Sequence, residues 1–151
     1  MMKNNKGVTL IALVITIIVM LIILGITVVT LDNLLRGTDL RKMKTNLHLI
    51  EARAQTLLND YLFDGTDKLG AGTTKDVTEF GWEINEEQYI YRQWNASDLA
   101  KQGIKNTDVA SNEFFIIQYD IINEEVDVAS TRGIKDEDGN SYYTLSSLRN
   151  K

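Results

Sequence analysis

Residues 8–31 read VTLIALVITIIVMLIILGITVVTL, a stretch without a single charged side chain. As an α-helix, with a rise of about 1.5 Å per residue, it would extend about 36 Å, more than the roughly 30 Å hydrocarbon layer of a bilayer. Lys3 and Lys6 precede the stretch, and the next basic residue is Arg36. The positive-inside rule then keeps the N-terminus in the cytoplasm and places the chain from Asp32 onward outside. The stretch therefore predicts a single membrane-spanning helix.

Two other kinds of export segment also contain an apolar stretch near the N-terminus. A cleaved secretory signal has an apolar core of roughly 7–15 residues followed by a small-x-small cleavage site. The stretch here is longer, and neither Gly25-Ile26-Thr27 nor Val28-Val29-Thr30 makes a good cleavage site. An uncleaved signal anchor fits the length better. Neither alternative explains why a glycine directly follows a lysine at the start of the apolar run.

The composition of the whole chain excludes several kinds of chemistry. Its 151 residues include no cysteine, which rules out disulfides, thiolate zinc sites and a cysteine nucleophile. The chain has a single histidine, His48, which rules out a multi-histidine metal site. In the predicted helix His48 lies beside the apolar face. The sequence shows no nucleophile–base arrangement and no glycine-rich phosphate loop. We therefore expect a protein that is not an enzyme and needs no cofactor.

Residues 32–63 carry a second helical pattern. Apolar residues recur there at alternating intervals of three and four, which is typical of a helix with one buried face. The helix is expected to bend or fray, if anywhere, at Gly37 and to end near Phe63, because loop-forming residues follow. An intermolecular coiled coil is the alternative, but sheet-forming sequence follows and favours a stripe that buries a sheet. The stripe consists of Leu40, Met43, Leu47, Ile50, Ala54, Leu57 and Tyr61.

The C-terminal part of the chain predicts short strands and turns. Glu87–Trp94 is aromatic and roughly alternating, while 114–122 and 126–131 flank a hairpin signal at Asn123-Glu124-Glu125. Asn95 is placed to cap a short helix that Gly103 would close. Residues 142–145 follow a turn at Asp138-Gly139-Asn140. The sequence thus predicts an α+β fold, in which a long N-terminal helix packs in its second half on an antiparallel sheet of three or four strands.

The residues at the start of the apolar run resemble a known processing site. Lys6-Gly7-Val8-Thr9-Leu10-Ile11 resembles the cleavage and methylation segment of type IV prepilins and pseudopilins. That family has a short basic leader ending in glycine, followed by an apolar residue, Thr-Leu-Ile and a long hydrophobic stretch. The resemblance implies that prepilin peptidase cuts between Gly7 and Val8 on the cytoplasmic side and methylates the new amine of Val8. No catalytic residue is implied.

The resemblance also implies an organisation and a function. Residues 1–7 would be the leader, 8–31 the transmembrane and filament-core helix, 32–63 its amphipathic continuation and 64–151 an acidic β-rich head. The chain would be a structural subunit of a type IV pilus or of a type II secretion or competence-like filament. It would wait in the cell membrane as a single-pass protein with its head outside, and then join like pilin subunits in a surface filament. The assembly platform and ATPase would act on it indirectly.

The alternative to a filament subunit is a single-pass anchored protein whose outer domain binds a partner without polymerising. One departure from the family bears on its role. Most members have a glutamate five residues into the mature chain, where this chain has Ala12. That glutamate meets the methylated amine of a neighbouring subunit, so that neither charge is left alone in an apolar core. Ala12 indicates either that the chain is a minor or tip subunit, or that Gram-positive-like members of the family commonly lack the glutamate.

The part of the chain after the apolar stretch has a basic segment followed by an acidic one. Residues 64–151 carry nine basic and seventeen acidic side chains, a net charge of −8 that disfavours direct binding of nucleic acid. A basic cluster precedes this head and would contact either anionic lipid headgroups or the acidic head of an adjacent subunit. The cluster consists of Arg36, Arg41, Lys42 and Lys44.

One acidic segment of the head resembles a calcium loop faintly. Asp136, Asp138 and Asn140 place oxygen ligands at alternate positions beside a glycine. The segment lacks the spacing and the terminal glutamate of an EF-hand, so a hairpin turn is the favoured interpretation. Some pseudopilins bind calcium in a head loop, which keeps this weak metal candidate open.

The processing site yields a first prediction. Gly7→Leu should block cleavage, because a bulky side chain before the cut obstructs the peptidase, and a precursor that retains residues 1–7 should accumulate in the membrane. Gly7→Ala, which keeps a small side chain, is the control and should mature. Intact-mass measurement of membrane and surface fractions reads the result. Normal maturation of Gly7→Leu would mean that this peptidase does not process the chain.

Overall fold

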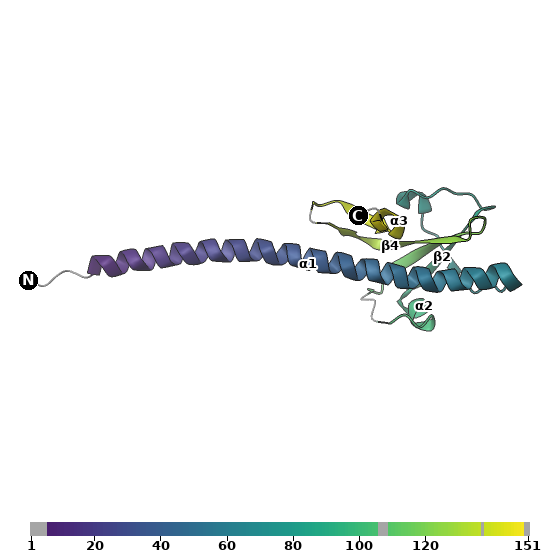
Figure 1. Ribbon diagram of the computed structural model, residues 1–151, viewed down its shortest axis with the longest axis horizontal. Helices are drawn as coiled ribbons and strands as arrows, with labels where there is room; N and C mark the ends of the chain where they lie inside the picture. Colours follow the sequence, from purple (N-terminus) through teal and green to yellow (C-terminus); the bar gives the residue numbers. More distant parts are fainter. Residues whose placement is uncertain (1–5, 106–108, 137, 150–151) are drawn as a thin grey trace, which may run out of the picture. The chain divides into compact units, whose positions relative to one another are not determined.

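The computed structural model describes residues 6–105, 109–136 and 138–149, with the side chains of 6–8, 25–34 and 36 outside the description. The chain forms two compact units, residues 1–38 and 39–151. One long helix, α1 (Lys6–Asp64), contributes to both. The second unit holds a five-stranded sheet, and Figure 1 shows strands β2 and β4 beside the later turns of α1. The predicted α+β fold, with a long helix packed on an antiparallel sheet, is confirmed.

Helix α1 ends one residue beyond the predicted position. Gly65, at φ +74°, donates its backbone N–H to the Tyr61 carbonyl at 2.9 Å, and Thr66 N–H reaches the Asp64 carboxylate at 2.8 Å. A left-handed glycine directly after the last turn is a common helix terminator. At Gly37, where the sequence allowed a bend or fray, the backbone is helical.

The sheet has one strand more than the three or four that were predicted. Its strands run antiparallel in sequence order, so each neighbour in the chain is a neighbour in the sheet. The additional strand is β1, in a segment predicted as loop, and it pairs only with Arg92 and Gln93 of β2. Two residues are too few to show alternation. The strands are β1 (Ala71–Gly72), β2 (Tyr89–Asn95), β3 (Phe114–Asp120), β4 (Glu125–Lys135) and β5 (Ser141–Thr144).

Two short helices connect strands of this sheet, and a third follows the last strand. The α2 helix (Ala96–Lys101) has the predicted cap, since the Asn95 side chain accepts Asp98 N–H at 3.0 Å and Asp98 accepts Asn95 N–H at 3.1 Å. The 3₁₀ helix η1 (Val77–Phe80) and α3 (Leu145–Arg149) were not predicted. Leu145, expected in the last strand, instead begins α3, a helix too short to show periodicity.

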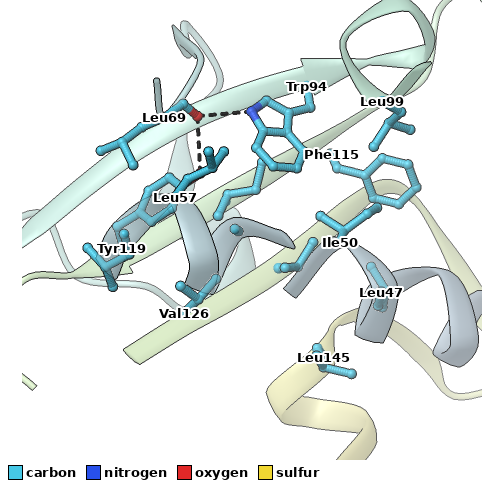
Figure 2. Close-up of a cluster of buried hydrophobic side chains, with 14 of the residues drawn as sticks. Leu47, Ile50, Leu57, Leu69, Trp94, Leu99, Phe115, Tyr119, Val126 and Leu145 are labelled. Atoms are coloured by element: carbon cyan, nitrogen blue, oxygen red, sulfur yellow. Dashed lines mark hydrogen bonds between the residues drawn. The ribbon is translucent and has the colours of Figure 1, made fainter. Parts of the chain in front are cut away.

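One face of the sheet packs on the stripe of α1. Leu47, Ile50 and Ala54 are completely buried, Leu57 is nearly so, and Figure 2 shows several of them beside Trp94, Phe115 and Tyr119. The predicted stripe is thereby confirmed; Leu40, Met43 and Tyr61 are its partly buried members. Leu58 is also fully buried, although the predicted stripe did not include it.

A single carbonyl organises the polar atoms of this core. The Leu69 carbonyl accepts the Trp94 Nε1–H at 2.9 Å and the Tyr119 hydroxyl at 3.1 Å, as the dashed lines of Figure 2 show. Burial raises the pKa of Tyr119 well above its ordinary value, so this hydroxyl stays a donor at any physiological pH. Both aromatic polar atoms are therefore satisfied inside the core.

The opposite face of the sheet carries a smaller aromatic cluster. Trp82 stacks on Tyr91 with ring centroids 5.9 Å apart, and its Nε1–H donates to Asp127 at 3.1 Å. The side chains of Val77, Ile116 and Ala129 complete the cluster. Trp94 and Tyr91 therefore pack on opposite faces of β2.

The contact between Gly70 and Trp94 provides a second prediction. Gly70 lies at φ +114°, and a Cβ atom there would be 2.4 Å from Trp94 Nε1. Gly70→Ala should therefore displace the indole from the Leu69 carbonyl and lower the free energy of unfolding by about 2–4 kcal/mol. Urea denaturation of the full chain in detergent, followed by tryptophan fluorescence, measures the change.

Gly72→Ala is the matched control for this substitution. Gly72 lies in β1, two residues after Gly70, and a Cβ atom there would meet nothing within 4 Å. Its effect should stay within about 0.5 kcal/mol. Equal losses in the two variants would mean that the Trp94–Leu69 contact does not anchor this core.

Candidate functional site

The first unit presents an apolar helical surface. Thirteen large hydrophobic side chains between Leu10 and Leu24 are each 46–66% exposed. The hydroxyl of Thr16 donates to the Ala12 carbonyl at 2.8 Å, so this polar atom is satisfied within the helix. A helix that is apolar on all sides belongs in lipid or among other helices. We define residues 9–24 as the apolar helix surface.

The residues of the predicted processing site lie at the start of α1. Lys6, Gly7 and Val8 have helical backbone, and their side chains lie outside the description, whereas Thr9, Leu10 and Ile11 are exposed. The Gly7–Val8 bond thus falls in the first helical turn. The predicted cleavage of this bond would require that turn to open, which glycine favours because it is a poor helix former. Ala12 is also exposed.

Two predicted segments are described only in part. Residues 1–5 of the predicted leader lie outside the described residues, as do the side chains of Val8 and of 25–31 in the predicted membrane span. Within the described part of the chain, no helix combines the length and apolarity that a bilayer crossing requires. The span over 8–31 stays a prediction.

The described members of the basic cluster and His48 lie on α1, and His48 is exposed. Arg41 and Lys42 are exposed and Lys44 is half-buried, while the Arg36 side chain lies outside the description. His48 Nδ1 is 3.2 Å from Glu51 Oε2, and Glu51 also pairs with Arg149 of α3. Glu51 thus ties α3 to α1, a link that the sequence did not reveal. Glu51 is thus the side-chain partner of His48 within the described part of the chain.

The weak calcium candidate forms the turn before β5. The buried Asp136 carboxylate accepts hydrogen bonds from Asp138 N–H at 3.0 Å, Asn140 N–H at 2.8 Å and the Tyr142 hydroxyl at 3.0 Å. Asp138 and Asn140 are thus bound to Asp136 through their N–H groups. Among the described residues, no group of three His, Cys, Asp or Glu side chains could hold a metal ion. The hairpin-turn interpretation accounts for the hydrogen bonding here.

A second buried carboxylate, which the sequence analysis missed, closes the β3–β4 hairpin. Asp120 accepts Gln88 Nε2–H at 3.0 Å, Ile122 N–H at 3.0 Å, and both the N–H and the side-chain amide of Asn123, at 2.9 and 2.8 Å. Burial on its own would raise the pKa of Asp120, but these hydrogen bonds outweigh it, and the pKa lies below its ordinary value. An Asp followed by Asn three residues later was the available signal.

Comparisons with known proteins identify no relative of this chain from which a function could be inferred. No family model matches the chain, and no curated protein or solved structure matches it either. The features that bear on function are therefore the segment Lys6–Ile11, the apolar helix surface and the head, in which α1 packs on the sheet.

The depressed pKa of Asp120 gives a third prediction. Its carboxylate stabilises the fold above the unfolded pKa of about 3.9, and that contribution is lost as the pH falls through the lower folded pKa. Asp120→Asn should lower the free energy of unfolding by about 1–3 kcal/mol at pH 7. The difference in this free energy between variant and wild type should shrink as the pH falls below about 4. Urea denaturation across this pH range measures it.

The control for Asp120 is Asp60→Asn, an exposed carboxylate on α1. That variant should change the free energy of unfolding by less than about 0.5 kcal/mol at either pH. A difference between Asp120→Asn and wild type that stays constant from pH 7 to pH 2 would show that ionisation of Asp120 does not contribute.

Proposed function

We propose that this chain is a structural subunit, a pilin or pseudopilin, of a type IV pilus or a type II secretion or competence-like filament. The observation that carries the proposal is the division of α1. Its first unit exposes apolar side chains on all sides, whereas its later residues bury one stripe beneath the sheet of the head. A helix divided in this way can act as an anchor in its first part and form part of the folded head in its later part.

Burial energetics supports this proposal. Covering a large aliphatic side chain is worth about 1.5–3 kcal/mol, and thirteen such side chains are exposed between Leu10 and Leu24. The helix therefore needs an external cover. In the proposal, bilayer lipid covers it before assembly and like helices cover it in the filament. The head has its own core and needs no such cover.

Two further features support the same assignment. The motif Lys6–Ile11 resembles the prepilin cleavage and methylation site, so residues 1–7 are proposed to be removed by prepilin peptidase. The confirmed head layout, a long helix packed on an antiparallel sheet, is the arrangement that this resemblance implies. The proposed location is the cell membrane and then the cell surface, with the head outside.

Ala12 favours a minor subunit. After cleavage the amine of Val8 would carry a positive charge, and Ala12 supplies no carboxylate for it. A subunit repeated along the whole filament would place such an amine in the apolar core at every level, at a cost in desolvation each time. A subunit used once, at a tip, would incur this cost once or not at all.

The filament proposal predicts protein neighbours for the apolar helix surface. A photo-reactive benzoylphenylalanine placed at Ile18 should cross-link to other pilin-like helices, and the adducts should be recovered with sheared surface filaments. The same group at Ser97, which is exposed on α2 of the head, is the control for non-specific capture. Cross-links to lipid alone, with all of the chain retained in the membrane, would instead support the anchored, non-polymerising binding domain.

The minor-subunit assignment makes a separate prediction for Ala12→Glu. In a tip subunit the added carboxylate has no amine to meet, so filament yield should stay unchanged or fall. The cost is bounded by about 2.5–3.5 kcal/mol for an acidic side chain at mid-membrane and is smaller near the interface. The measurement is the stoichiometry of sheared filaments from wild type and variant. A wild-type chain that forms most of the filament mass would contradict the assignment.

A further inference from the structure

The head contains a cavity that the filament proposal does not use. It has a volume of about 290 Å³ and lies between the first turns of α1 in the second unit and the sheet strands β3 and β4. Small-molecule sites usually measure about 300–1,000 Å³, so this cavity suits a ligand of few atoms. Its apolar lining includes Met43, Phe115 and Ile134.

The side chain of one serine, Ser130, lines this cavity. Ser130 is only 6% exposed and lines the cavity from β4, where it pairs in register with Phe115 of β3. The hydrogen bonds among the described residues include none to its Oγ atom. Among the described residues, Arg92 Nε is the buried side-chain polar atom that lacks a partner, so the Ser130 oxygen is accessible rather than sealed in the core. A hydroxyl can both donate and accept. Ser130 therefore offers a ligand one donor and one acceptor at the inner wall.

The charged groups of the lining balance one another. Arg132 Nε lies 3.8 Å from Glu113 Oε1, and Glu113 Oε2 accepts the Ala110 N–H at 3.3 Å, so these two side chains are engaged with each other. Asp39 and Lys42, three residues apart on α1, complete the charged lining and form no ion pair with another described residue. The cavity thus presents one available anion and one available cation.

We propose that this cavity binds a small zwitterion with an apolar side group, an aliphatic α-amino acid being the simplest member of the class. Its ammonium group faces Asp39, its carboxylate faces Lys42 and accepts the Ser130 hydroxyl, and its side chain lies on Met43 and Phe115. A simple anion would meet the carboxylate of Asp39, and a simple cation would meet Lys42. The proposal concerns the head alone and does not depend on polymerisation.

Calorimetric titration of the full chain in detergent tests the proposal with three related probes. L-leucine should bind saturably at one site. Leucinamide, which lacks the carboxylate, and N-acetyl-leucine, which lacks the ammonium group, should each bind about tenfold more weakly. No saturable binding of leucine, or equal binding of the three probes, would overturn the proposal.

Variants assign each end of the ligand. Lys42→Gln should bind leucine and leucinamide equally, because it removes the cation that meets the ligand carboxylate. Asp39→Asn should bind leucine and N-acetyl-leucine equally, because it removes the anion that meets the ligand ammonium group. Lys44→Gln and Asp60→Asn, at α1 positions outside the cavity lining, are the charge-matched controls and should bind as wild type does. Unchanged discrimination in Lys42→Gln or Asp39→Asn would overturn the assigned orientation and with it the proposal.

Ser130→Ala tests the inner wall. Because the Ser130 hydroxyl has no partner among the described residues, its removal should leave the thermal stability of the head unchanged. The affinity for leucine should fall about fivefold to tenfold. Thermal unfolding of the same samples verifies that the head is intact. Unchanged leucine affinity in a folded Ser130→Ala variant would contradict the proposed contact.

Discussion

The contact between the stripe of α1 and one face of the sheet is the interaction on which the head depends. Leu47, Ile50 and Ala54 are completely buried there, and the strands that line this face pair with their chain neighbours in an antiparallel meander. A sheet with an uncovered apolar face is marginal in water. The later turns of α1 remove that face from water, and α3 adds Leu145 and Leu148 to the same core.

The sequence predicted the parts of the fold that have a long or strong local pattern. The stripe repeats over seven positions, and Asn95 caps α2 with side-chain chemistry that can be read from neighbouring residues. Two-residue β1 and five-residue α3 are too short for any period. Trp82 reaches Asp127 across 45 positions, a contact that local pattern does not contain. Likewise, the sequence shows Ser130 as an ordinary strand serine, and the cavity that it lines forms only when β4 packs near α1.

The two parts of α1 differ in what can cover them. The later residues find their cover inside the head, so their burial is fixed by this chain alone. The apolar helix surface has to find its cover outside the chain, in lipid or in other helices. Cleavage after Gly7 would free an N-terminus at the start of that surface, and this is why processing, membrane location and assembly form one proposal rather than three.

The mature N-terminus tests that proposal most directly. The chain should be isolated from the cell envelope in its native form, and its N-terminal peptide should be analysed by mass spectrometry. The account predicts a chain that begins at Val8 and carries a methyl group on the α-amine. A chain that begins at Met1 or Met2 would contradict it, whatever the head is later found to bind.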